Sequence, residues 1–237
     1  MRMNGNNGYL IAGYIENSGS TNDATLTSLD LNGNINWTRS YSYGSSYDDV
    51  ASCVQVTPDG FILIGSSQSH VQGPANAFLI KTNSLGLIQQ TTLIGGTDNI
   101  TGAYIQALSD GSFIGLGNKS TGSIFLFKLD NSLNNVWSQV IGGATGNDSG
   151  SSIQIISDNE IALVGTHTLS DNTSNFSLFK TDGQGNLIFS RYYGQAGLQR
   201  ATAFTHTTDG GFIMVGSNNI EGMNTMTLIK VKPNGEL

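Results

Sequence analysis

One short segment recurs five times along this chain of 237 residues, at nearly even spacing. Each copy places a turn of the Asn-Gly, Asp-Gly or Asp-Asn type before a run of apolar residues that ends in glycine. The closing residues are Gly13, Gly65, Gly117, Gly165 and Gly216, which gives intervals of 52, 52, 48 and 51 residues. Such a period is typical of repeat architectures, because one supersecondary unit cannot bury its apolar face alone and must stack on its neighbours.

Three further segments recur together with this motif, although the first and the last copy each lack one of them. A segment before it begins with small residues and carries a polar side chain at one fixed place: Gln55, Gln106, Gln154 and Thr205. A segment after it ends in a tight turn, and a last segment then starts at Trp37, Gln90, Trp137 or Phe189. Short apolar runs between such turns predict four antiparallel strands per repeat, which we call A, B, C and D.

The expected fold is therefore all-β: a five-bladed β-propeller of four-stranded antiparallel blades. We expect one domain over 1–237, with blades at about 1–43, 44–95, 96–142, 143–194 and 195–237. The first repeat has only a stub of strand A, and the last ends before strand D. The alternative is therefore a five-blade portion of a larger propeller.

The repeat resembles that of bacterial and archaeal β-propeller proteins with the pattern D-G-G-[FY]-x-x-x-G, then L-x-K-x-D-x-x-G-N-x-x-W and a Gly-Gly pair. The resemblance covers nearly the whole chain. It departs from the pattern at Ser28, which replaces the lysine, and at Gln90, which replaces the aromatic residue. It rests on Asp209-Gly210-Gly211-Phe212 with Gly216, on Lys81, Lys128, Lys180 and Lys230, on Asp30, Gly33, Trp37 and Trp137, and on Gly95-Gly96 and Gly142-Gly143. It implies a propeller from a secreted or surface protein, in a group often without an assigned activity.

Composition excludes several classes of function. The formal net charge is −7, so nucleic acid is not an expected partner, because a phosphate backbone needs a basic face. No apolar run is long enough to span a membrane, and residues 1–10 show no secretory signal. Cys53 is the only cysteine and is predicted to be a small buried residue. Extracellular or cell-surface localisation is favoured by composition.

Variable loops on a rigid scaffold are where binding residues usually lie. In the predicted blades, the B–C and D–A connections are the longer ones and share one face. Four charged residues at or near the start of strand A are the candidate ligand-binding residues at the axis entrance: Asp49, Asp98, Asp148 and Arg200. A ring of carboxylates can bind a cation or a sugar, or act as an acid–base pair. The competing interpretation is that these aspartates cap backbone N–H groups of the loops.

Other polar residues are interpreted structurally. Asp30 and Asp182 lie in tight turns that lack the full ligand series of a calcium loop. His70, His167 and His206 share no metal-binding spacing, and Trp37 and Trp137 are expected between blades or over the outer edge. No catalytic residue, metal or cofactor is predicted, because no nucleotide-binding loop or nucleophile motif occurs.

Three functions fit this sequence. The first is a non-enzymatic binding module that presents its loops to a protein or a glycan, because the repeat accounts for nearly every polar residue. The second is a glycoside-cleaving propeller, which needs two or three carboxylates within about 5–10 Å of each other. The third is a structural spacer that associates laterally.

Overall fold

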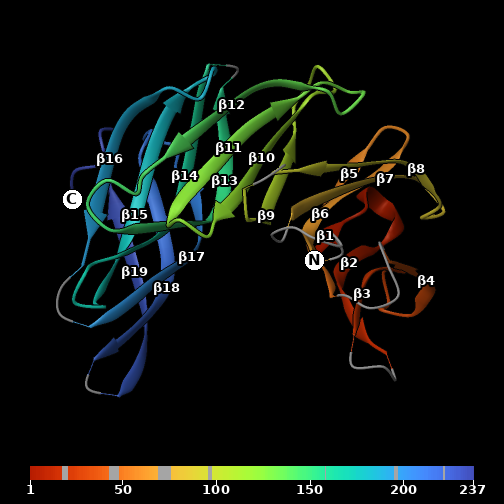
Figure 1. Ribbon diagram of the computed structural model, residues 1–237, viewed down its shortest axis with the longest axis horizontal. Helices are drawn as coiled ribbons and strands as arrows, with labels where there is room; N and C mark the ends of the chain where they lie inside the picture. Colours follow the sequence, from red (N-terminus) through yellow and green to blue (C-terminus); the bar gives the residue numbers. More distant parts are fainter. Residues whose placement is uncertain are drawn as a thin grey trace. The chain divides into compact units, whose positions relative to one another are not determined.

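The computed structural model describes residues 1–17, 21–42, 48–68, 76–95, 98–157, 159–194, 197–220 and 222–237. Among these residues every regular element is a strand, apart from one short 3-10 turn, so the predicted all-β class is confirmed (Figure 1). The chain forms two compact units, Met1–Ser120 with Leu129–Asn134, and Thr121–Lys128 with Asn135–Leu237.

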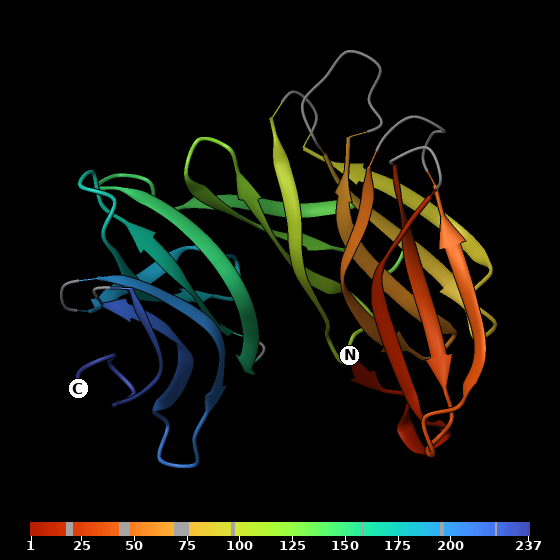
Figure 2. The same ribbon diagram turned by 90° about the horizontal axis from the view of Figure 1, so that it is seen from below.

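Unit one contains the strands of the first two repeats and the first two strands of the third. These elements are β1 (Arg2–Met3), η1 (Gly5–Asn7), β2 (Tyr9–Glu16), β3 (Asn22–Leu29), β4 (Ile35–Tyr41), β5 (Asp49–Thr57), β6 (Gly60–Ser67), β7 (Asn76–Asn83), β8 (Ile88–Ile94), β9 (Ile100–Ala107) and β10 (Phe113–Lys119). Figure 2 shows the long antiparallel strands of this unit from below.

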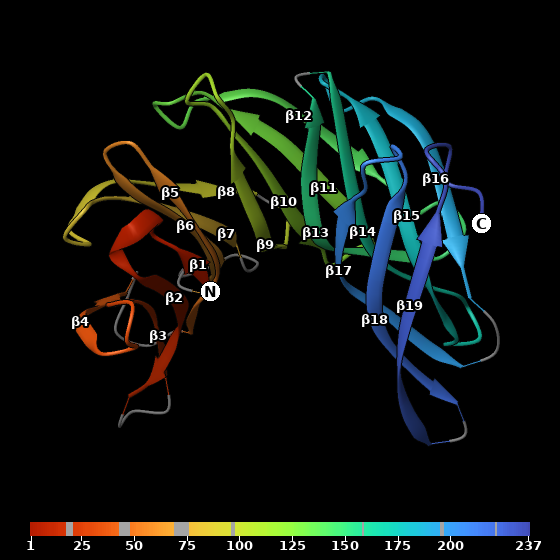
Figure 3. The same ribbon diagram turned by 180° about the vertical axis from the view of Figure 1, so that it is seen from behind.

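Unit two contains the remaining strands, and Figure 3 shows β17, β18 and β19 side by side within it. Its elements are β11 (Ser123–Leu129), β12 (Asn135–Ile141), β13 (Asn147–Ser157), β14 (Glu160–Thr168), β15 (Ser174–Asp182), β16 (Leu187–Tyr193), β17 (Leu198–His206), β18 (Phe212–Ile220) and β19 (Met223–Val231).

The sheets follow the repeat. Three have four strands, in the orders β1–β2–β3–β4, β5–β6–β7–β8 and β12–β11–β10–β9. A fourth has seven strands, but its β15 and β17 meet at one parallel pair, Ser174 with Leu198. It therefore consists of a four-stranded sheet, β13–β16, and the three strands β17–β19. Four-stranded antiparallel sheets are thus confirmed, whereas five blades in a ring and the blade boundaries stay predictions.

The turns between strands A and B are of two kinds, where the sequence predicts only two-residue turns. In β5–β6, Thr57 faces Gly60 across a two-residue turn. The β9–β10 turn is one residue longer: the N–H of Leu108 donates to the carbonyl of Ser112. Gly111 in that turn has φ +81°, a left-handed conformation that glycine adopts without steric cost. The longer loop follows from that glycine, since three-residue hairpin turns end in a left-handed residue.

The turns between strands C and D are closed by a side chain. One carboxylate oxygen of Asp30 accepts hydrogen bonds from the backbone N–H groups of Asn32 and Asn34, both at 2.8 Å. Asp130 and Asp182 make the same bonds in their own turns. Hydrogen bonds, above all from the Asn34 side chain, lower the pKa of Asp30. The turn interpretation of Asp30 and Asp182 is confirmed, because their oxygens are used locally.

The C–D turns of the second and fifth repeats also dock on the preceding repeat. Gly86 has φ +74°, and a Cβ there would lie 2.7 Å from the ring of Trp37. The hydroxyl of Tyr41 donates to the carbonyl of Gly86 at 2.9 Å, and burial raises the pKa of Tyr41 to about 12. The contact recurs in unit two, where Tyr193 donates to the carbonyl of Gly235 at 2.6 Å. Trp37 therefore packs between repeats, as one of the two predicted alternatives has it.

Apolar side chains from neighbouring repeats fill the space beneath these contacts. In unit one they join β2 and β3 to β5, β6 and β7, and in unit two they join β14, β15 and β16 to β17, β18 and β19. Phe61, Phe78, Phe176 and Phe212 are among the largest of them. Over the residues described, no helix is long and apolar enough to cross a bilayer.

Candidate functional site

In the second to fifth repeats, one buried residue lies at the start of strand A. It stands two positions before the residue that pairs with the glycine closing the repeated motif, which is Gly65, Gly117, Gly165 or Gly216. Its partner on strand B lies directly opposite. The four pairs are Asp49 with Ser67, Ile100 with Lys119, Asp148 with His167, and Gln199 with Asn218. Directly opposite residues of an antiparallel pair point to the same face of the sheet, so each pair forms a small side-chain unit.

The predicted carboxylates do not share one structural position. Asp49 is fully buried in the first of these pairs. Asp98 precedes β9 and forms a 2.7 Å ion pair with Lys119, with about half of its side chain exposed. Arg200 lies within β17, opposite Ser217, and is exposed.

Asp148 and His167 form a closed buried pair at 2% exposure each. One carboxylate oxygen of Asp148 lies 3.0 Å from Nδ1 of His167, and the other accepts the backbone N–H of Gly143 at 2.9 Å. Gly142 and Gly143 have φ +79° and +80°, and a Cβ on Gly142 would clash with the same carboxylate. The Gly-Gly pair of the motif thus lets the loop wrap around the aspartate.

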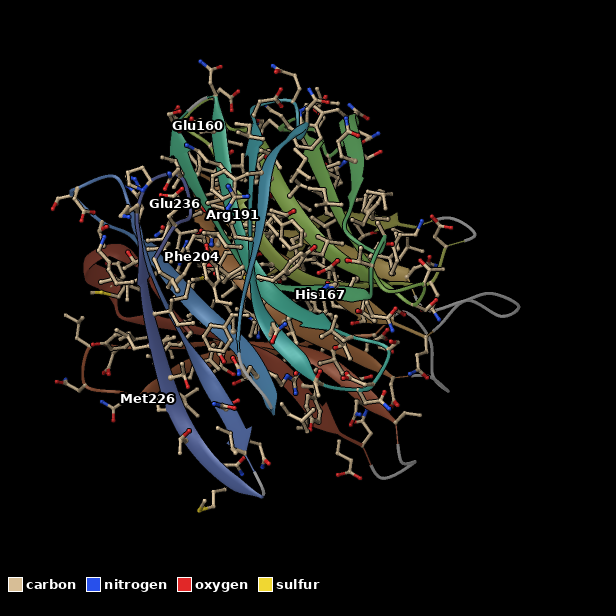
Figure 4. The ribbon with its side chains drawn as sticks, turned by 90° about the vertical axis from the view of Figure 1, so that its left-hand side faces the viewer. Glu160, His167, Arg191, Phe204, Met226 and Glu236 are labelled. Atoms are coloured by element: carbon tan, nitrogen blue, oxygen red, sulfur yellow. The ribbon has the colours of Figure 1, made fainter. Side chains whose placement is uncertain are left out.

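Two groups cover the imidazole of His167. The ring of Tyr192 stacks on it at 4.1 Å between centroids, and the Phe179 ring meets Tyr192 edge-on. A Cβ on Gly146 would lie 2.8 Å from Cε1 and 3.0 Å from Nε2 of the imidazole, so backbone covers that edge. Burial, and then the charge of Asp148, raises the pKa of Tyr192. Figure 4 shows His167 and Glu160 at opposite ends of β14.

A carboxylate that orients an imidazole through Nδ1 is the arrangement of a general base. Here Nε2 lies against backbone and the ring against a tyrosine, so a substrate atom has no room beside it. Asp148 therefore closes a loop and satisfies a buried histidine. The sequence proposed Asp148 as a ligand-binding candidate, with capping of the loop as the alternative, and gave no pairing with His167.

The fourth pair is open where the third is closed. Gln199 and Asn218 line a pocket of about 390 Å³ in unit two, between β16 and the strands of the fifth repeat. Asn218 Oδ1 is buried and has no hydrogen-bond partner, although the residue as a whole is partly exposed. The other lining residues are Tyr192, Tyr193, Gly194, Thr227, Ile229 and Leu237.

The geometry of the repeat explains this pocket. At the third pair, Tyr192 extends from β16, the strand outside β15, and covers His167. In the sheet order of the described strands, β19 pairs with β18 alone. Tyr192 and Tyr193 of β16 line one side of the pocket of Gln199 and Asn218. Thr227 and Ile229 of β19 line it as well, so amide, hydroxyl and aliphatic groups face one space.

A metal centre has no support in the part of the chain that the structure describes. No group of three or more histidine, cysteine, aspartate or glutamate side chains there could hold a metal ion. His70 lies outside the described residues. His206 lies beside the ring of Phe212, 5.5 Å between centroids.

Comparison with solved structures shows a shared fold. The chain resembles a structure described as NanB with optactamide (TM-score 0.55, 12% identity, 91% of this chain and 36% of the other). It also resembles an exo-β-1,3-galactanase from Phanerochaete chrysosporium with galactose (0.51, 13%, 93% and 60%). A third is a subtype N10 neuraminidase-like protein of A/little yellow-shouldered bat/Guatemala/060/2010 (0.51, 12%, 94% and 76%).

The chain thus spans about a third and three fifths of the length of the first two structures. At such low identity the likeness concerns the fold, which is propeller-like. No family profile matches the sequence, and no curated protein matches it either.

Proposed function

We propose that this chain is a non-enzymatic propeller module that binds a glycan in the pocket of Gln199 and Asn218. The observation that carries the proposal is the buried Oδ1 of Asn218, an acceptor without a partner in the wall of a 390 Å³ pocket. A buried acceptor without a partner is costly, and a ligand hydroxyl would satisfy it.

The lining suits a sugar. A sugar ring presents hydroxyls at its rim and C–H groups on its faces. The pocket offers amides and the Thr227 hydroxyl for the first, and Ile229 and Leu237 for the second. Its volume lies within the range of about 300–1,000 Å³ that small-molecule sites occupy. The galactanase of similar fold was solved with galactose, which makes galactosides the first ligands to test.

Two of the candidate carboxylates are already bonded to other protein groups, and this favours glycan binding over glycan cleavage. Asp98 is paired with Lys119, and Asp148 is bonded to His167 and to the loop backbone. A glycosidase needs one carboxylic acid and one carboxylate that are both open to the glycosidic bond. Cleavage stays the alternative. Release of reducing sugar that Asp98→Asn abolishes would establish it.

The test is titration of the whole chain with galactose, β-1,3-linked galactobiose, glucose and mannose, followed by calorimetry or ligand-observed NMR. We expect binding of at least one saccharide, weakened about tenfold or more by Asn218→Leu, which keeps side-chain volume but removes the amide. Lys119→Met is the matched control, since Lys119 holds the same register in the third repeat and lies outside the pocket. Equal binding by Asn218→Leu, or no binding by the unmodified chain, would contradict the proposal.

A further inference from the structure

A second pocket, of about 120 Å³, lies in unit one and shares no residue with the proposed glycan site. Three strands A form its walls: Arg2 comes from β1, Ser52, Cys53 and Gln55 from β5, and Tyr104 from β9. Met1, Ala12 and Val54 complete the lining. The sequence predicts a buried Cys53, but its side chain is partly exposed, because it borders this pocket.

Gln55 is the polar residue of strand A in the second repeat, and only 5% of it is exposed. Its Oε1 accepts a 2.5 Å hydrogen bond from Nη2 of Arg2. Its Nε2 is buried and has no oxygen or nitrogen acceptor, and the Gln55 side chain also lies within hydrogen-bond reach of the Cys53 thiol. The acceptor of this amide is therefore satisfied inside the protein, whereas its donor is left in the pocket wall.

The pocket is rich in donors and carries positive charge. No aspartate or glutamate is among its lining residues, and Arg2 supplies a permanent cation. The thiol of Cys53 is directed to the carbonyls of Val54 and Ile105, at 3.8 and 3.7 Å. Burial raises the pKa of this thiol, and the charge of Arg2 only partly opposes that effect, so it adds no negative charge at neutral pH.

We propose that this pocket binds a small carboxylate between Arg2 and the Gln55 amide. A carboxylate only accepts hydrogen bonds, and its two oxygens match two neighbouring donors. Its negative charge complements the positive charge of the Arg2 guanidinium. The volume is slightly below that of a cavity of about 150 Å³ that holds benzene, so the site accommodates acetate or a ligand of similar size.

The fourth repeat provides an internal contrast. Gln154 holds the same place in strand A, but its Oε1 accepts the backbone N–H of His206 at 2.7 Å. A backbone amide there does what Arg2 does at Gln55, without the charge. Gln154→Leu is therefore the matched control for a variant at Gln55.

The experiment uses the only cysteine of the chain as a reporter. The alkylation rate of Cys53 by iodoacetamide is measured against sodium acetate, with sodium chloride at equal ionic strength and neutral acetamide as references. Line broadening of ¹³C-acetate is followed on the same samples, so that binding is read without cysteine chemistry.

Acetate is expected to slow alkylation saturably, whereas chloride and acetamide leave it unchanged. Arg2→Gln and Gln55→Leu should each weaken acetate binding about tenfold or more in both measurements, while Gln154→Leu keeps it. Absence of both protection and broadening in the unmodified chain would overturn the proposal, as would unchanged acetate binding by Arg2→Gln. Neither result bears on the glycan proposal, whose pocket contains none of these residues.

Discussion

The pairs Asp148–His167 and Gln199–Asn218 hold the same register in consecutive repeats, yet one is closed and the other open. At the first, the two side chains bond each other and Tyr192 covers the imidazole. At the second, Asn218 Oδ1 is buried without a partner, and the residue lines a pocket. The repeat supplies the same backbone register at both places, whereas the side chains of the pair and the strand beside them determine whether a polar group is bonded inside the protein or borders a pocket.

The largest expected effect is the loss of the closed pair. Asp148→Ala leaves a buried histidine and the Gly143 N–H without their acceptor, so we expect unfolding to become easier by about 3–5 kcal/mol. Denaturant unfolding of the two proteins measures this difference. Asn218→Leu serves as the reference at the open pair, and a loss below about 1 kcal/mol for Asp148→Ala would show that the pair is not a structural unit.

Removal of the cover is expected to cost less. Tyr192→Ala takes away the ring that stacks on His167 and meets Phe179, and about 40% of Tyr192 is exposed. We expect a loss of about 1–2 kcal/mol, because aromatic pairs add about 0.5–1.5 kcal/mol beyond buried area. Thermal unfolding checks the value, with Tyr14→Ala, an exposed tyrosine of unit one, as the control.

Titration at alkaline pH distinguishes Tyr192, which lies beside Asp148, from Tyr193, which donates to the carbonyl of Gly235. The folded-state pKa of Tyr192 lies above 10, so its contribution to stability is complete below pH 10 and is lost as the pH rises through the folded value. Asp148→Asn should lower the pKa of Tyr192, because the charge of Asp148 is the second cause of the shift. Burial raises the pKa of Tyr193 to about 12, without Asp148 among the causes, so this value should stay. NMR titration of ¹³C-labelled tyrosine follows both, and equal shifts in the two residues would refute the assignment.

The smallest effect is expected at the open pair itself. Asn218→Leu replaces an amide whose buried oxygen has no partner, so its stability should stay within about 1 kcal/mol of the unmodified chain. The variant thus loses glycan binding without losing the fold. Chemical unfolding next to the saccharide titration separates the two outcomes, and a loss of 3 kcal/mol would mean that Asn218 is structural after all.

Much of the fold could be predicted from the sequence, because turn chemistry and period are local signals. The tight turns at Asp30 and Asp182 and the order of strands A to D agree with the structure. The pairing of Asp148 with His167 could not be predicted by counting residues outward from the turn between β13 and β14. Two β-bulges interrupt β13, and a hairpin without bulges, counted from Ser157 opposite Glu160, would place Leu169 opposite Asp148. The register at the motif glycines, Gly150 with Gly165, is the signal that would have found it.

The pocket lined by Gln199 and Asn218 could not be predicted from the sequence, for a different reason. It depends on which strand covers Asn218, and this is a property of the sheet order rather than of any motif. The candidate set Asp49, Asp98, Asp148 and Arg200 came from sequence proximity to strand A. The structure assigns Asp98 to an ion pair and Asp148 to a buried pair, and burial separates Asp49 from the exposed Arg200.

The most direct test of the account is an NMR titration of the labelled chain with β-1,3-linked galactobiose, with the side-chain amides of Asn218 and Gln199 assigned. We expect saturable shifts of these two amides and of Thr227, while the signals of the Asp98–Lys119 pair, which lies outside the pocket, stay in place. Shifts confined to residues outside the pocket, or equal shifts at both pairs, would contradict it.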